Sequence, residues 1–134
     1  MSRHQRGVLD TSAIIDIASI PPAELPSEAS ITAVSVAELT AGPLSTNDPS
    51  ERARRLERLQ WVENTFEAIP FDSSAARAYG RVYAAALAAA QKPRGARAMD
   101  LLIAATALSR GLPLYTRNGA DFRSVADLLE IVAI

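Results

Sequence analysis

Short apolar segments alternate with helical patterns along the whole chain, and this alternation restricts the fold more than any other feature. We expect strands that end at Leu9 and that cover Ile31–Val34, Ala68–Phe71, Leu114–Thr116 and part of Leu129–Ile134. These segments do not alternate strictly between apolar and polar residues, which is typical of strands buried on both faces of a parallel sheet. The pattern therefore predicts a three-layer α/β/α fold with a short parallel sheet of four to five strands.

Start signals for four helices lie between the expected strands. The expected caps or first residues are Thr11 or Ser12, Ser35, Asp48 and Ser73 or Ser74. The third of these helices has the fullest signal, because Pro49 suits the first helical position and Glu51 would complete a capping box with Asp48. Glu51 is also spaced to pair with Arg55.

The last two helices differ in pattern. The alanine-rich helix is expected to have Ala76, Tyr79, Tyr83, Leu87 and Ala90 on one side, which would lie in the core or at an interface. The following helix, expected over Asp100–Leu108 and ended by Gly111, is apolar on nearly all sides. Such a helix is typically buried against a sheet.

Composition sets further limits. The 134 residues suit one domain, covering 1–134, with a single core. The sequence has no Cys, so it can form neither a disulfide scaffold nor a thiolate metal site. The net charge of −1 does not indicate a nucleic-acid binder, and arginine enrichment can reflect genomic base composition as well as phosphate binding. Asp10 and Asp16 interrupt the apolar stretch after the basic start, and no run reaches the roughly 20 apolar residues of a membrane span, so we expect a soluble cytoplasmic protein.

Four acidic residues fall where the predicted topology would bring them together. Asp10 ends the first strand, Glu38 lies one turn into the helix after the second, Asp100 opens the apolar helix, and Asp121 follows the fourth strand. Ligands of such sheets bind beyond the carboxyl ends of the strands. Each acid alone also has a structural interpretation, since Asp10, Asp100 or Asp121 could serve a helix terminus and Glu38 could be a solvated charge.

The combination of four acids favours a metal centre. Clustered carboxylates raise each other's pKa unless a cation neutralises them. Oxygen ligands without Cys, and with His4 in the N-terminal arm as the sole histidine, select Mg²⁺ or Mn²⁺ over zinc. Such ions polarise phosphodiesters and activate water. The chemistry indicated is phosphodiester hydrolysis.

Four linked motifs carry a family resemblance. They are Val8-Leu-Asp-Thr-Ser-Ala13, Val34-Ser-Val-Ala-Glu-Leu39, Met99-Asp-Leu-Leu-Ile-Ala-Ala105 and Thr116-Arg-Asn-Gly-Ala-Asp-Phe122. In this order the motifs resemble those of PIN-domain ribonucleases and, more narrowly, of VapC-type toxins of toxin–antitoxin systems. The resemblance covers nearly the whole chain and implies a Mg²⁺-dependent endoribonuclease, with Mn²⁺ as a possible substitute.

The resemblance also assigns roles to residues. It implies that Asp10, Glu38, Asp100 and Asp121 are metal ligands or their close supporters. Four supporting residues are implied near them: Ser12, Thr11, Asn118 and Thr116. Basic residues are expected where RNA approaches an acidic pocket, and Arg94, Arg97, Arg117 and Arg123 are placed to contact phosphates, although each could equally be an ordinary surface charge.

Partners follow from the resemblance alone. It implies RNA as substrate, a VapB-like antitoxin protein that occupies the site, and a homodimer. The helices over Pro49–Phe66 and Ser73–Gln91 could supply a groove for a partner, or could satisfy both apolar stripes inside the monomer.

Other enzyme classes fit the sequence less well. A haloacid-dehalogenase-type phosphatase would need a second Asp at position 12, which is Ser. A receiver domain would need an acidic pair before the first helix and a lysine where Arg117 stands. A nucleotide-binding switch would need a Gly-rich phosphate loop, and the sequence has none. The alternative of a different kind is a non-catalytic PIN-fold module that binds RNA or protein, which the four intact acids argue against.

Overall fold

The computed structural model describes residues 4–134, and over these residues it contains a five-stranded parallel sheet. The strand order is β3-β2-β1-β4-β5, and every neighbouring pair is parallel. The strands are β1 (Arg6–Leu9), β2 (Glu28–Thr32), β3 (Ala68–Ile69), β4 (Leu114–Thr116) and β5 (Ile131–Ala133). The α/β class and the short parallel sheet predicted from the sequence are confirmed.

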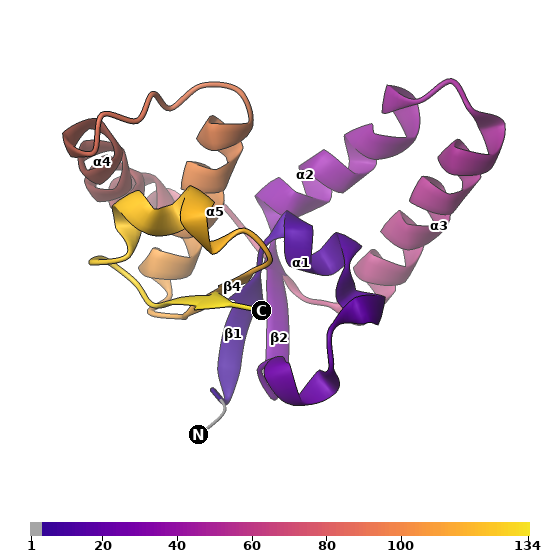
Figure 1. Ribbon diagram of the computed structural model, residues 1–134, viewed down its shortest axis with the longest axis horizontal. Helices are drawn as coiled ribbons and strands as arrows, with labels where there is room; N and C mark the ends of the chain where they lie inside the picture. Colours follow the sequence, from indigo (N-terminus) through magenta and orange to yellow (C-terminus); the bar gives the residue numbers. More distant parts are fainter. Residues whose placement is uncertain (1–3) are drawn as a thin grey trace.

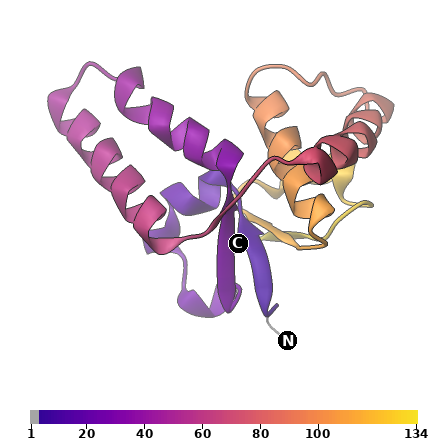
Figure 2. The same cartoon turned by 180° about the vertical axis from the view of Figure 1, so that it is seen from behind.

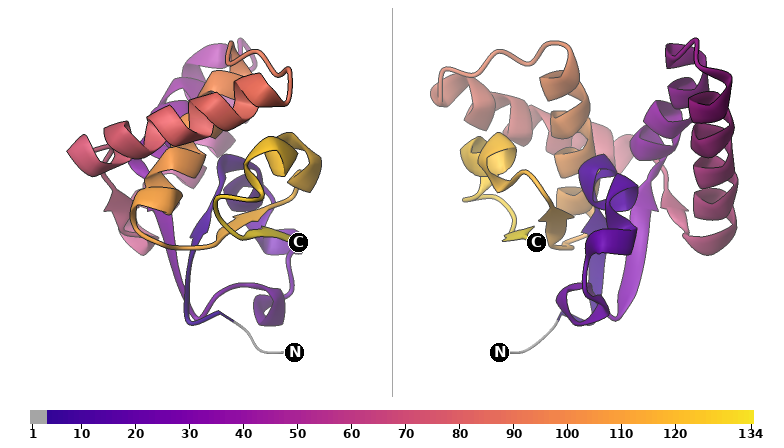
Figure 3. Two further views of the ribbon diagram at one scale, coloured as in Figure 1. Left: turned by 90° about the vertical axis from the view of Figure 1, so that its left-hand side faces the viewer. Right: turned by 45° about the vertical axis from the view of Figure 1, so that its right-hand side comes forward.

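Helices cover both faces of this sheet. They are α1 (Thr11–Ile15), α2 (Ala33–Ala41), α3 (Pro49–Thr65), α4 (Ser73–Ala88) and α5 (Ala96–Ser109). Short 3-10 segments connect them: η1 (Ile17–Ser19), η2 (Pro22–Glu24), η3 (Gly42–Ser45) and η4 (Gly119–Val125). In Figures 1 and 2, α2 and α3 extend to one side of the strands while α4 and α5 extend to the other. Figure 3 shows α1 between these two pairs of helices.

Two apolar clusters fill the space between the sheet and the helices, one on each face. Val8 and Leu114 point into the cluster formed with α4, α5 and η4. Their chain neighbours Leu9 and Tyr115 point into the cluster formed with α1, α2 and α3. Successive strand residues point to opposite faces, so strands buried on both sides must be apolar throughout. No helix among residues 4–134 has the length and apolarity to cross a bilayer.

Three helix starts differ from the sequence prediction. Asp10, rather than Thr11 or Ser12, caps α1, because its carboxylate accepts from the N–H of Ala13. In the same way Asp72, rather than Ser73 or Ser74, caps α4. The third is α5, which begins at Ala96, so Asp100 lies inside the helix and does not open it.

The second strand is also shifted. It covers Glu28–Thr32 rather than Ile31–Val34, since the Thr32 hydroxyl accepts from the N–H of Ser35 and thereby starts α2 two residues before Ser35.

The predictions for α3 and α4 are partly right. Asp48 caps α3 as expected, but Glu51 makes no capping box and bonds Arg54 and Arg55 instead. The buried side of α4 is also rotated from the predicted one. It contains Ala75, Val82 and Ala86, while Tyr83 and Leu87 are exposed.

Candidate active site

Asp10 lies where β1 ends and α1 begins, and it is almost completely buried, with 3% of its surface exposed. One carboxylate oxygen accepts from the Thr116 hydroxyl at 2.6 Å. The other accepts from the Ser12 hydroxyl at 2.7 Å and from the N–H of Ala13 at 2.9 Å. Burial raises the pKa of Asp10, although the bonds from Thr116, Ala13 and Ser12 oppose that rise. The carboxylate is therefore rigidly held by three donors.

The donors themselves have fixed directions. Ser12 Oγ accepts from the backbone N–H of Arg117 at 3.1 Å, and Thr116 Oγ1 accepts from the backbone N–H of Asn118 at 3.0 Å. Each hydroxyl thus accepts a hydrogen bond from a backbone N–H of the loop after β4 and donates one to the Asp10 carboxylate. Loop and strand residues more than 100 positions from Asp10 determine its orientation.

Glu38 lies on α2 and is half-buried. Its Oε1 accepts from the Thr11 hydroxyl at 2.6 Å, and the Ser35 hydroxyl lies 2.9 Å from the same Thr11 oxygen. Because the Thr11 hydroxyl donates its one hydrogen bond to Glu38, the Ser35 hydroxyl is the donor in its hydrogen bond with Thr11. Thr11 therefore positions a different acid from the one that Ser12 contacts.

Asp100 lies in the second turn of α5. Burial, followed by the negative charges of Asp121, Asp10 and Glu38, raises its pKa to about 7, while Arg97 opposes the rise. These effects require Asp121, Asp10 and Glu38 to lie within electrostatic range of Asp100.

Asp121 and Asn118 come from the loop that follows β4. Asp121 lies in η4 with an exposed side chain, and its backbone carbonyl accepts from Arg97 Nη1 at 3.4 Å. Asn118 precedes η4, and its side chain makes no capping hydrogen bond there. Its backbone N–H, rather than its amide, contributes to the centre by bonding Thr116.

The predicted basic residues differ in their relation to the acids. Arg97 lies beside the acids. Its charge lowers the pKa of Asp100, and its guanidinium donates to the backbone carbonyl of Asp121. The Arg117 side chain forms an exposed ion pair with Asp16, with Nε 3.4 Å from the carboxylate oxygen. Arg94 is exposed in the segment before α5. Arg123 is exposed in the last turn of η4, two residues after Asp121.

The donor set suits a hard divalent cation. All four side chains offer carboxylate oxygen, the ligand that Mg²⁺ and Mn²⁺ prefer. Burial raises the pKa of Asp100 most, and the negative charges of the other three acids raise it further, which a cation would offset. Within residues 4–134, however, no three His, Asp or Glu side chains already converge in a ligand cluster. The Asp10 carboxylate accepts hydrogen bonds from Ser12 and Thr116, and the Glu38 carboxylate accepts one from Thr11.

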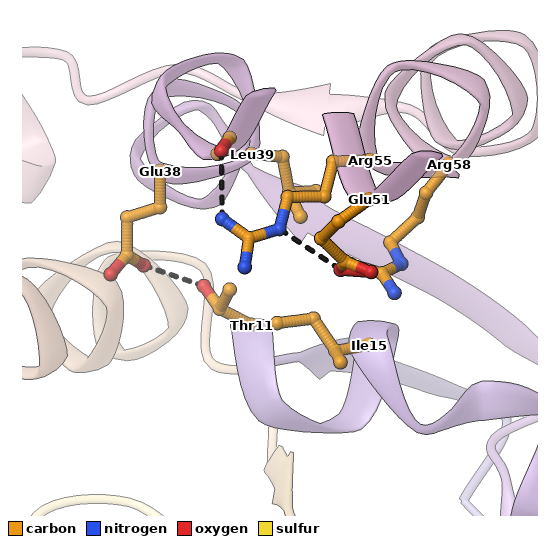
Figure 4. A pocket seen from close by; sticks show the side chains of 8 residues that line it. Thr11, Ile15, Glu38, Leu39, Glu51, Arg55 and Arg58 are labelled. Atoms are coloured by element: carbon orange, nitrogen blue, oxygen red, sulfur yellow. Dashed lines mark hydrogen bonds and ion pairs between the residues drawn. The ribbon is translucent and has the colours of Figure 1, made fainter. Parts of the chain in front are cut away.

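Sequence reasoning missed a cavity next to Glu38. It has a volume of about 410 Å³ and lies between α1, α2 and α3 (Figure 4). Arg55 and Arg58 of α3 line it together with Thr11 and Glu38. The spacing of Glu51 and Arg55 had indicated an ordinary surface ion pair, and a helix pattern alone does not reveal which element a charged face approaches.

Comparisons with known proteins identify the family of this chain. The sequence pattern of the PIN domain matches residues 7–128. Ribonuclease VapC5 of Mycobacterium tuberculosis is 37% identical over 133 residues, which cover 96% of this chain and 95% of that protein. Ribonuclease VapC of Rickettsia bellii is 31% identical over 102 residues, covering 75% and 73% of the two chains.

Solved structures give the same result. A crystal structure of VapBC-5, a member of the VapBC family of toxin–antitoxin systems from M. tuberculosis, has a chain that is 35% identical with a TM-score of 0.85, covering 97% of this chain and 99% of that one. A chain in DNA-bound VapBC from Salmonella typhimurium shares the fold, with a TM-score of 0.74 at 24% identity over 96% of each chain. The chain therefore belongs to the PIN-domain family and, within it, to the VapC ribonucleases.

Proposed function

We propose that this protein is the endoribonuclease toxin of a toxin–antitoxin pair and hydrolyses RNA phosphodiester bonds at the centre formed by Asp10, Glu38, Asp100 and Asp121. The observation that carries the proposal is the buried Asp10 carboxylate at the carboxyl edge of the sheet, which Ser12, Ala13 and Thr116 hold by hydrogen bonds. The similar proteins are named ribonucleases, and this supports RNA as the substrate.

The four acids would hold Mg²⁺, or Mn²⁺ in its place, directly or through water. A bound divalent cation supplies Lewis-acid polarisation of the phosphate and lowers the pKa of a water molecule. Ser12 and Thr116 keep Asp10 oriented as an acceptor, and Thr11 does the same for Glu38. These hydroxyls reduce the reorganisation that the carboxylates would need during reaction.

Water, rather than a side chain, is the proposed nucleophile. Its oxygen forms a bond to phosphorus while the bond to the leaving ribose oxygen breaks, and the leaving oxygen takes up a proton. His4 bonds Glu130 at 2.8 Å, so the single histidine does not serve as a base for a serine in the centre. Arg97 is the predicted arginine best placed to contact RNA phosphate, and we include Arg94 and Arg117 in the same rim.

Cleavage of total cellular RNA tests the proposal. Antitoxin-free protein is incubated with Mg²⁺, Mn²⁺ or EDTA, with Asp10→Asn and the matched control Asp127→Asn, whose carboxylate is exposed and outside the centre. We expect discrete products that require metal, that persist in Asp127→Asn and that are lost in Asp10→Asn. Affinity for RNA without products, from folded partner-free protein with any metal, would instead identify a binding module.

Two partners are part of the proposal. The VapBC complexes among the similar structures support a VapB-like antitoxin that covers the centre. We also propose a homodimer in the cytoplasm, supported by the exposed apolar side chains of Tyr83 and Leu87 on α4, which the monomer leaves uncovered.

A further inference from the structure

The cavity between α1, α2 and α3 shares Glu38 with the proposed metal centre. Its remaining walls are formed by Thr11, Ile15, Leu39, Gly42, Glu51, Arg55 and Arg58. Its volume of about 410 Å³ lies within the range of roughly 300–1,000 Å³ that is typical of small-ligand sites. A group of nucleotide size bound here would lie directly next to whatever the four acids hold.

Arg55 is fixed in this cavity by two hydrogen bonds. Its Nε donates to Glu51 Oε2 at 3.1 Å and its Nη1 donates to the carbonyl of Gly42 at 2.9 Å. Because a guanidinium has five N–H donors, others stay available to a ligand. Figure 4 shows the guanidinium between Glu51 and the Thr11–Glu38 pair. This cation is therefore ordered before any ligand arrives.

Arg58 adds a second cation that makes no ion pair or hydrogen bond among residues 4–134. It is half-buried, and within residues 4–134 the structure gives its guanidinium no acidic or carbonyl partner. Glu51 does not supply one, because Arg54 and Arg55 already donate to both of its oxygens and hold its pKa below the usual range. A half-buried charge without a counter-ion favours binding of an anion.

We infer that this cavity binds the nucleotide next to the scissile bond of the RNA substrate, with its phosphate on Arg58 and Arg55 and its sugar or base against Ile15 and Leu39. The inference rests on the proposed ribonuclease function. An RNA strand whose scissile phosphate lies at the acids must continue in both directions. Arg97 lies beside the acids on α5, and the two α3 arginines lie beyond Glu38, so cations occur on both sides of the centre.

The position of Glu38 between the cavity and the proposed metal centre favours RNA as the occupant over a free anion. Glu38 lines the cavity and belongs to the proposed metal centre, so an occupant of the cavity would be a neighbour of the group held at that centre. A flanking phosphodiester is covalently joined to that phosphate and brings its own negative charge to Arg58. The planar guanidinium forks of two arginines suit its paired oxygens.

Cleavage kinetics on one RNA with a mapped cleavage site test the inference. We compare wild type with Arg58→Gln and with Arg81→Gln, a control that removes the same charge from an exposed position on α4. We expect Arg58→Gln to lower kcat/KM about tenfold, mainly through KM, as loss of one charge-assisted contact does. It should also reduce the slope of log kcat/KM against log salt by about 0.7, while Arg81→Gln changes neither.

A chemical change in the RNA gives an independent readout. Methylphosphonate replaces each phosphate flanking the scissile bond, one at a time. Neutralising the phosphate in the cavity should lower wild-type cleavage about tenfold and should cost Arg58→Gln nothing further, because the contact is already lost. Equal losses in both proteins at every position, or Arg58→Gln behaving like Arg81→Gln, would overturn the inference while leaving the nuclease intact. Absence of cleavage by wild type would overturn the proposed function itself.

Discussion

Replacing Asp100 with Asn tests the electrostatics of the centre without RNA. The half-buried Asp100 carboxylate has a pKa of about 7, raised from 3.8 by burial and then by Asp121, Asp10 and Glu38. A shift of about three units corresponds to about 4 kcal/mol at ~1.4 kcal/mol per unit. Solvent screening reduces this by roughly half for a group at the protein surface. We therefore expect metal-free Asp100→Asn to be about 2 kcal/mol more stable than wild type at pH 8.

The stability difference between Asp100→Asn and wild type depends on pH. Between about pH 4 and pH 7 folded wild type keeps a proton on Asp100 that the unfolded chain releases, so wild-type stability falls as pH rises through this window. The neutral Asn side chain removes this particular dependence. The stability advantage of Asp100→Asn should therefore be small near pH 4, grow towards pH 7 and level off above it.

Thermal and urea unfolding in EDTA, followed by circular dichroism from pH 4 to pH 9, measures this difference. A gain of about 2 kcal/mol corresponds to a rise in Tm of about 4–8 °C for a chain of this length. Saturating Mn²⁺ should stabilise wild type more than the variant and narrow the gap. A variant that is equally stable or less stable than wild type at pH 8, or a difference independent of pH, would refute the electrostatic reasoning.

Two further predictions concern packing and assembly. Gly7→Ala should destabilise the protein by about 1–3 kcal/mol in urea unfolding, because the new Cβ would come within 2.6 Å of the buried Tyr115 ring. Gly80→Ala in α4, whose Cβ would meet nothing within 4 Å, should be neutral or should stabilise the protein by up to about 1 kcal/mol. A more stable Gly7→Ala than Gly80→Ala would contradict this packing. Leu87→Glu should convert a dimer to a monomer in sedimentation velocity if α4 forms the interface, whereas Leu44→Glu, exposed in η3, should not; a dimer unaffected by Leu87→Glu would exclude this face.

The sequence predicts the sheet and the carboxyl edge that positions the site. Apolar strands buried on both faces, each followed by a helix, allow few arrangements, so Asp10 and Asp121 could be assigned to the same edge. Helix starts were less predictable because several capping residues follow one another. Asp10 and Asp72 each precede two hydroxyl residues that could serve as caps, and only the local backbone geometry decides among them.

Other features depend on contacts between distant segments. The side that α4 buries could not be predicted, because Val82 and Ala86 pack in one core cluster with residues of α5, while Tyr83 and Leu87 stay exposed. The bond from Thr116 to Asp10 spans 106 positions. The cavity at Arg58 likewise requires three helices to meet, and no local sequence pattern encodes that meeting.

Calorimetric titration of Mn²⁺ into metal-free protein tests most directly whether the four acids form one metal centre. Wild type and Asp127→Asn should bind Mn²⁺ with the same affinity, while Asp10→Asn and Asp100→Asn, each shown to be folded, should bind at least tenfold more weakly, the loss expected for one ligand. Equal Mn²⁺ affinity in all four proteins would place any bound ion elsewhere and would contradict the account.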